Sequence, residues 1–91
     1  MKSLKPSMKE NKRYLLVRGK NLRENVEKAI LEFVGTLGMS KCGLNFISSK
    51  DGEAIISVNR EAVDSVRASL VVFKEKMEVL KVSGTLRGLK G

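Results

Sequence analysis

The chain has 91 residues, a length that fits one domain and leaves no room for two. It carries 18 Lys and Arg side chains against 10 Asp and Glu, a formal net charge of +8 that suits nucleic acid first and acidic lipid second. No apolar run approaches the roughly 20 residues that a membrane-spanning helix needs, and the N-terminal lysines are not followed by the apolar stretch of a secretory signal. The single cysteine excludes an internal disulfide and fits a reducing cytoplasm.

The positive charge is concentrated at the two ends of the chain. Residues 1–13 carry five basic side chains against one acid, a net charge of +4, and residues 79–91 carry three basic side chains and no acid, a net charge of +3. Residues 1–13 are also polar, which predicts a flexible basic arm ahead of a single domain over residues 14–91.

The first half of the domain predicts a strand and an amphipathic helix. Residues 14–17 form a β-rich run that ends at Gly19. Asn21 is a suitable N-cap and Glu24 stands three residues later, as in a capping box. Gly38 fits the end of the helix. The apolar stripe of this helix consists of Leu22, Val26, Ala29, Ile30, Phe33, Val34 and Leu37.

The second half predicts a hairpin, a second helix and a last strand. Strands are expected over residues 44–47 and 54–58, joined by a tight turn with an Asp-Gly pair. Asn59 can cap the second helix, and the last strand is expected over residues 79–83. The apolar face of this helix consists of Val63, Val66, Leu70, Phe73 and Met77. The β-α-β-β-α-β order predicts an α+β, ferredoxin-like and RRM-like sandwich, with a four-stranded antiparallel sheet and two helices on one face.

This topology has a consequence for the charge. The first and last strands lie side by side and antiparallel, so the arm before Tyr14 and the tail after Ser83 leave the sheet at one edge. The two basic clusters then merge into one patch of about +7, which predicts binding to RNA phosphates. The main candidates are Lys9, Lys12, Arg13, Lys81, Arg87 and Lys90, with Ser83 and Thr85 for hydroxyl contacts and Arg18 and Arg67 as secondary candidates. A simple strand exit is the alternative role for Ser83 and Thr85.

The sequence lacks the residue combinations that are typical of an enzyme active site or a metal site. There is no histidine, the usual general base and the commonest metal ligand. Cys42 has neither a zinc-type partner nor a base and is expected to be a small loop or strand-edge residue. The acidic side chains are scattered mainly over predicted helix faces and form no evident magnesium site. We therefore predict no catalytic residue, no metal ligand and no cofactor bound by the protein.

Two related folds offer alternatives. Acylphosphatases carry a phosphate-cradling loop after the first strand, but here Glu24 brings a carboxylate to a loop that would need bare main-chain amides. Standard RRM domains stack bases on aromatic side chains of a central strand, and residues 54–58 contain none. Tyr14 and Phe46 are the only aromatic residues on predicted strands, and we expect both to serve packing.

The face of the second helix opposite its apolar stripe is unusually small and smooth. It carries small and apolar side chains where lysine or glutamate is common, which predicts a protein interface. The candidate interface residues are Ser65, Ala68, Ser69 and Val72.

Several segments together resemble one family. Residues 6–9 leading to Lys12-Arg13-Tyr14, then Arg60 with residues 66–70, and finally Val82-Ser83-Gly84-Thr85-Leu86-Arg87 are similar to the archaeal RNase P protein component 2 family, which is related to the eukaryotic Pop-five subunit. The sequence departs from the family at Lys81, where a glycine is usual. It also stops at Gly91, before the longer basic helical tail of some relatives.

The resemblance implies an accessory subunit of ribonuclease P in the cytoplasm. It implies pairing with the barrel-shaped RNase P protein component 3, in a heterotetramer with two copies of each, and binding to RNase P RNA and precursor tRNA. The RNA and its magnesium ions would remove the 5′ leader, and the chain alone would not be catalytic. The alternatives are a protein-interaction or small-ligand regulatory module and, less favoured, an acylphosphatase-like enzyme.

Overall fold

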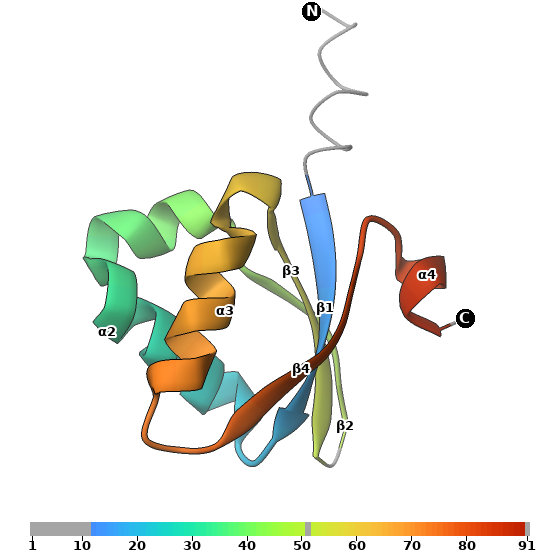
Figure 1. Cartoon of the computed structure of the whole chain (residues 1–91), viewed down its shortest axis with the longest axis horizontal. Coiled ribbons are helices and arrows are strands. Elements are labelled where there is room, and N and C mark those ends of the chain that lie inside the picture. Colours follow the sequence, from blue (N-terminus) through green and yellow to red (C-terminus); the bar gives the residue numbers. More distant parts are fainter. Residues whose placement is uncertain (1–11, 51, 91) are drawn as a thin grey trace, which may run out of the picture.

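The computed structural model describes residues 12–50 and 52–90 of the chain. Its strands have the order β2-β3-β1-β4, and every neighbouring pair is antiparallel. Helices α2 and α3 cover one face of this sheet (Figure 1), which confirms the predicted fold class. The elements are β1 (Lys12–Gly19), α2 (Leu22–Cys42), β2 (Asn45–Lys50), β3 (Glu53–Asn59), the 3-10 turn η1 (Arg60–Ala62), α3 (Val63–Val72), β4 (Met77–Ser83) and α4 (Leu86–Lys90).

One hydrophobic core fills the space between the sheet and the helices α2 and α3. Alternate residues of β1 and β3 point into it, as the period of two along a strand requires. Burying each large aliphatic side chain contributes about 1.5–3 kcal/mol, so this layer supplies most of the stabilisation. Its central members are Leu15, Val17, Val26, Ile30, Ile56, Val58, Val66 and Leu70.

Helix α2 bends at Gly35, which changes the predicted stripe. Gly35 has φ 78° and ψ 175°, values that glycine adopts without steric cost but that interrupt a helix. The stripe is fully buried only from Leu22 to Ile30. Phe33, just before the bend, and Leu37, beyond it, are 48% and 70% exposed, contrary to prediction. The helical spacing of apolar residues runs through Gly35 in the sequence, but the backbone of α2 changes direction at that residue.

The end of α2 also differs from the prediction. The helix continues past Gly38 to Cys42 and stops at Gly43, which adopts the left-handed conformation of a C-cap with φ 63°. Cys42 is therefore a buried helix residue rather than a loop or strand-edge residue. Burial raises the pKa of the Cys42 thiol above its usual value, which keeps it protonated and unreactive at neutral pH.

The predicted capping box at the start of α2 does not form. Asn21 precedes the helix, but it has φ 48° and its side chain makes no capping hydrogen bond. A capping side chain normally needs an extended backbone at this position, whereas Asn21 is left-handed. Asn25 Nδ2 donates to the Lys20 carbonyl at 2.8 Å, which ties the first turn of α2 to the preceding loop but does not cap the helix.

Helix α3 is shorter than predicted. It ends at Val72, Phe73 is extended, and Met77 is the first residue of β4. Phe73 and Met77 are both buried in the same core, so their spacing was consistent with a helix although neither belongs to one. Asn59 does not cap a helix with its side chain, which instead donates to the Lys41 carbonyl at 2.7 Å.

The chain ends in a short helix that the sequence pattern did not reveal. Helix α4 packs against β1 and β4 on the face opposite α2 and α3, here called the outer face (Figure 1). Leu89 is only 4% exposed there. Ser83 Oγ accepts the Thr85 N–H at 3.1 Å, and Thr85 Oγ1 accepts the Gly88 N–H at 3.1 Å, as an N-cap does.

The Thr85 cap provides a test of how α4 is held. Thr85→Ala should destabilise α4 locally by about 1 kcal/mol, the usual cost of losing a cap. Amide hydrogen exchange should then accelerate over residues 86–89 and stay unchanged at Leu15 and Val17. Thr85→Ser keeps the hydroxyl and is the control, and equal exchange in all three proteins would contradict the cap.

Gly43 provides a test of the packing at the end of α2. A Cβ added there would lie 2.9 Å from Asn59 Oδ1 and 3.0 Å from Lys12 Nζ, whereas one added at Gly52 would meet nothing within 4 Å. Both glycines have positive φ, so Gly43→Ala and Gly52→Ala share a backbone cost of about 1–2 kcal/mol. In urea unfolding, Gly43→Ala should be the more destabilising substitution. Equal losses would show that the contact with Asn59 and Lys12 is unimportant.

Candidate functional site

The start of β1 lies beside the ends of both neighbouring strands. Tyr14 pairs with Ser83 on β4, and Lys12 pairs with Asn59 on β3. The point where the domain begins and the point where β4 ends therefore meet at one end of the sheet (Figure 1). This confirms the topology on which the predicted basic patch depends.

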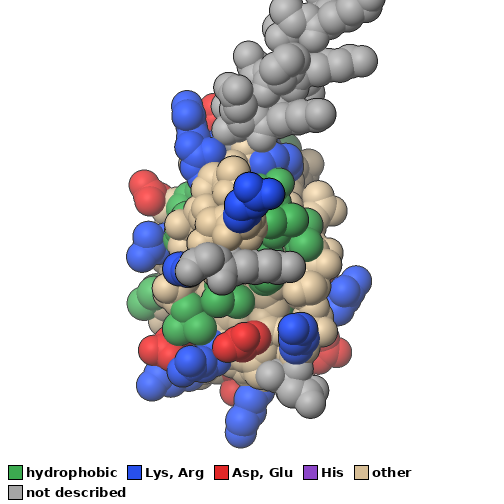
Figure 2. All heavy atoms as spheres, turned by 90° about the vertical axis from the view of Figure 1, so that its right-hand side faces the viewer, with side chains coloured by type: hydrophobic (Ala, Val, Ile, Leu, Met, Phe, Trp, Pro, Cys, Tyr) green, Lys and Arg blue, Asp and Glu red, His purple; other side chains and the backbone are tan. Residues whose placement is uncertain are grey.

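Two of the predicted phosphate-binding residues open β1 at this end, and two more lie on the adjoining β4 and α4. We call Lys12, Arg13, Lys81 and Arg87 the basic border. Lys12 and Arg13 open β1, Lys81 lies near the end of β4, and Arg87 is exposed on α4. In Figure 2, lysine and arginine side chains stand at the upper end of the outer face and also along its sides and lower end. Lys90 ends α4, and Lys9 lies outside the described residues.

Main-chain carbonyls hold three of these cations in place. Lys12 Nζ donates to the Gly43 carbonyl at 3.4 Å, and Lys81 Nζ donates to the Leu89 carbonyl at 3.4 Å. Arg13 Nη1 donates to the Lys12 carbonyl at 2.9 Å. An ammonium has three donors, so one main-chain bond positions each lysine and leaves donors for a phosphate.

The turn between β4 and α4 packs against Arg13. A Cβ added at Gly84 would lie 3.6 Å from Arg13 Nη1, in ordinary van der Waals contact, so the guanidinium rests beside this turn. Ser83 and Thr85 flank Gly84, and their hydroxyls already accept main-chain N–H groups. Their observed role is to shape the strand exit and cap α4, and contact with RNA stays a prediction.

The two secondary candidates lie away from the basic border. Arg18 is near the other end of β1, where it pairs in register with Glu53 on β3 and Glu78 on β4. The lower end of the outer face in Figure 2 accordingly shows basic and acidic side chains together. Arg67 is exposed on α3, in the helix layer.

Two basic residues at the same end of the sheet were not predicted. Lys41 lies in the last turn of α2, and Arg60 directly follows Asn59; both side chains are exposed. The observed pairing of β1 with β3 places Arg60 near Lys12, whereas the predicted patch rested only on the pairing of the first and last strands. No sequence signal placed Lys41 there, because the sequence indicated a helix end at Gly38.

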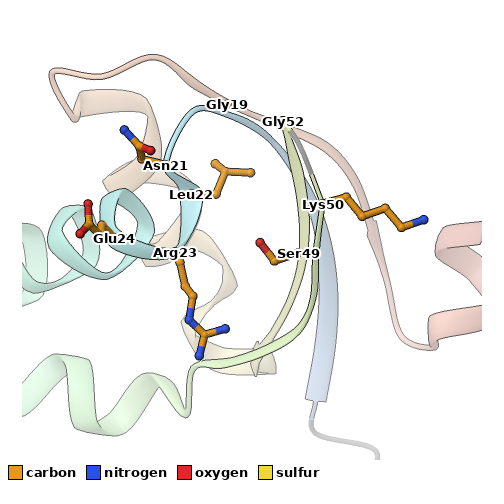
Figure 3. Close-up of a pocket in the computed structure, with 8 residues that line it drawn as sticks. All are labelled: Gly19, Asn21, Leu22, Arg23, Glu24, Ser49, Lys50 and Gly52. Atoms are coloured by element: carbon orange, nitrogen blue, oxygen red, sulfur yellow. The ribbon is translucent and has the colours of Figure 1, made fainter.

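The loop that resembles an acylphosphatase loop does not form a phosphate cradle. A hollow beside it is lined by Gly19, Asn21, Leu22, Arg23, Glu24, Ser49, Lys50 and Gly52. In Figure 3 the side chains of Arg23, Glu24 and Lys50 extend away from its centre. The Gly19 N–H donates to the Gly52 carbonyl at 2.9 Å, so this amide is already occupied. The Arg23 guanidinium instead lies over the Phe46 ring, 5.1 Å from its centroid. Phe46 itself packs against the core, as expected.

The predicted protein interface on α3 is partly wrong. Ser69 is fully buried, and its hydroxyl donates to the Ser65 carbonyl at 2.6 Å, so it belongs to the inner side of the helix. Val72 is 65% exposed, and its neighbour Val71 is 77% exposed, while Ser65 and Ala68 are half-buried. A smaller surface of Ser65, Ala68, Val71 and Val72 remains.

Within residues 12–50 and 52–90, no group of three or more Cys, Asp or Glu side chains is arranged to hold a metal ion. None of the helices in this part of the chain combines the length and apolar character needed to cross a membrane.

Comparison with known proteins connects this fold to one family. The sequence profile of the Rpp14/Pop5 family matches residues 5–91. Ribonuclease P protein component 2 of Methanocaldococcus jannaschii is 33% identical over 104 residues, covering 99% of this chain and 78% of that protein. The protein of the same name from Methanococcus aeolicus is 26% identical, covering 96% and 75%.

A solved structure supports the same fold. A chain in the cryo-EM structure of yeast ribonuclease MRP superposes with a TM-score of 0.67 at 17% identity, covering 86% of this chain and 77% of that one. The predicted resemblance to RNase P protein component 2 is thus confirmed, and the chain belongs to the Rpp14/Pop5 family.

Proposed function

We propose that the chain is a protein subunit of ribonuclease P that supports the catalytic RNA in removing the 5′ leader from precursor tRNA. The observation that carries this proposal is the family match over residues 5–91, together with relatives named Ribonuclease P protein component 2. The basic border supplies the physical means. It gathers cations at one end of the sheet, where an RNA backbone can dock.

The proposed mechanism is electrostatic. A folded RNA brings phosphates close together, and their mutual repulsion opposes the compact state. Lys12, Arg13, Lys81 and Arg87 would replace condensed counterions near these phosphates, and release of the counterions favours binding. Magnesium ions would be held by the RNA, and the cleavage chemistry would take place there.

The structure favours binding by backbone and shape rather than by base sequence. Strand β3 offers no aromatic side chain for stacking. Tyr14 is half-buried, and α4 packs on the outer face against β1 and β4. Phosphate contacts position an RNA without reading its sequence, so the protein would recognise a folded shape.

The helix layer would bind a protein partner, which we propose is RNase P protein component 3 in a heterotetramer. Exposed apolar side chains on this layer support the proposal. They are Leu31, Phe33, Leu37, Val71 and Val72, all at least 45% exposed. A single exposed leucine is normal, but several on one layer are typical of a surface that is covered in a complex.

The phosphate model predicts a steep dependence of RNA affinity on salt. If four to six phosphates are neutralised, log affinity should fall with log salt at a slope of about −3 to −5. Lys12→Ala with Arg13→Ala should make the slope shallower by about one unit per lost contact. Filter binding with an archaeal RNase P RNA measures this.

The control variant for this measurement removes two positive charges from another part of the surface. Lys28 and Lys74 are both exposed, on α2 and after α3. Their double alanine variant should keep the wild-type slope. Equal effects of the two double variants would argue that only net charge matters.

Reconstitution tests the biological role directly. The chain and RNase P protein component 3, added to the RNA, should stimulate cleavage of precursor tRNA at low magnesium. The Lys12→Ala, Arg13→Ala variant should stimulate cleavage less than the wild type. High magnesium should reduce this difference, because magnesium ions and basic side chains both supply positive charge to the RNA. Absence of stimulation by the wild-type chain would refute the proposal.

A further inference from the structure

We propose that the phosphate-binding surface continues from Lys12 onto the helix layer through Lys41 and Arg60, and that Asn59 is the positioning residue that holds them there. The inference rests on the RNA-binding function proposed above, and it names binding residues that the chain ends alone do not suggest. We call Lys12, Lys41, Gly43, Asn59 and Arg60 the Asn59 junction.

Three segments that are distant in the sequence meet at this junction. Lys12 of β1 pairs in register with Asn59 of β3, so Arg60 begins η1 beside the start of β1. Asn59 Nδ2 donates to the Lys41 carbonyl at 2.7 Å, and Lys12 Nζ donates to the Gly43 carbonyl at 3.4 Å. The end of α2 is therefore tied to both strands, as the meeting of α2, η1 and β1 at the top of Figure 1 shows.

The contact between these segments is tight. A Cβ at Gly43 would come within 3.0 Å of both Asn59 Nδ2 and Lys12 Nζ, so a larger residue there would have to push these side chains aside. The two hydrogen bonds and this close contact hold the end of α2 against β1 and β3. The exposed side chains of Lys41 and Arg60 are thereby presented from a fixed backbone on the same end of the sheet as the basic border.

The two hydrogen bonds also change the electrostatics of the helix end. The last carbonyls of a helix carry partial negative charge and would repel a phosphate. Here the Lys41 carbonyl is covered by the Asn59 amide and the Gly43 carbonyl by the Lys12 ammonium. These two bonds reduce the repulsion that the carbonyls at this end of α2 would exert on an anion, and Lys41 adds a positive charge in the last helical turn.

One acidic residue opposes this surface. Glu61 follows Arg60, and it lines a hollow together with Lys41, Val34, Gly38, Cys42, Ala62 and Ser65. Its carboxylate weakens the attraction of Lys41 and Arg60 for a phosphate. Glu61→Gln should therefore strengthen RNA binding at low salt, and the gain should disappear at high salt because screening removes the repulsion.

The main experiment measures salt slopes with an archaeal RNase P RNA transcript. Lys41→Ala with Arg60→Ala should make the slope shallower by about two units, as expected for two lost phosphate contacts. The Lys28, Lys74 double alanine variant has the same net charge and should bind as the wild type does. Circular dichroism and urea unfolding establish that each variant is folded.

The positioning role of Asn59 has a separate readout. Asn59→Ala should weaken binding in the wild-type background and have little further effect in the Lys41→Ala, Arg60→Ala background, a non-additivity that a double-mutant cycle detects. Equal losses in the two backgrounds would show that Asn59 contributes only to folding, and this would overturn its role.

The outcomes separate this inference from the function on which it rests. A slope changed by Lys12→Ala with Arg13→Ala, but not by Lys41→Ala with Arg60→Ala, would overturn the inference and leave the proposed function standing. Slopes unchanged in both variants would overturn the phosphate model itself. Slopes reduced in both would support a surface that runs from α4 across the start of β1 to the end of α2.

Discussion

The structure depends on the antiparallel pairing of β1 with both β3 and β4. Because β1 is shared, its inward side chains Leu15 and Val17 sit at the centre of the core. The same pairing brings its first residues beside the last residues of both neighbours. The pairing of β1 therefore both centres the hydrophobic core and brings the starts and ends of the strands together.

Much of the fold could be predicted from the sequence, because alternation in strands and helical spacing both leave a pattern in apolar residues. Pattern alone could not show where the backbone turns. Leu37 kept the helical period beyond the bend at Gly35, and Phe73 and Met77 kept it beyond the end of α3. Local φ values decide where a helix bends, and the two glycines within α2, Gly35 and Gly38, offer more than one place for a bend.

The candidate site was predictable only as far as it depends on topology. The two charged ends of the chain meet because the strand order requires it. Lys41 was missed because its position depends on where α2 stops, and Ser69 was misplaced because one helical position separates a buried from an exposed side chain. Helix α4 has five residues, too few for a period to be visible, so the cap formed by Thr85 could not be distinguished from a strand exit.

The closeness of the domain's entry and exit points has a practical consequence for handling the protein. An affinity tag or a fluorophore attached close to Lys12 or Ser83 would stand next to the basic border and would crowd it. The hairpin turn between β2 and β3 offers a better attachment point. Gly52 lies there beside Gly19, at the far end of β1, and its surroundings are open. A label placed at this turn would report on RNA docking without blocking the basic border.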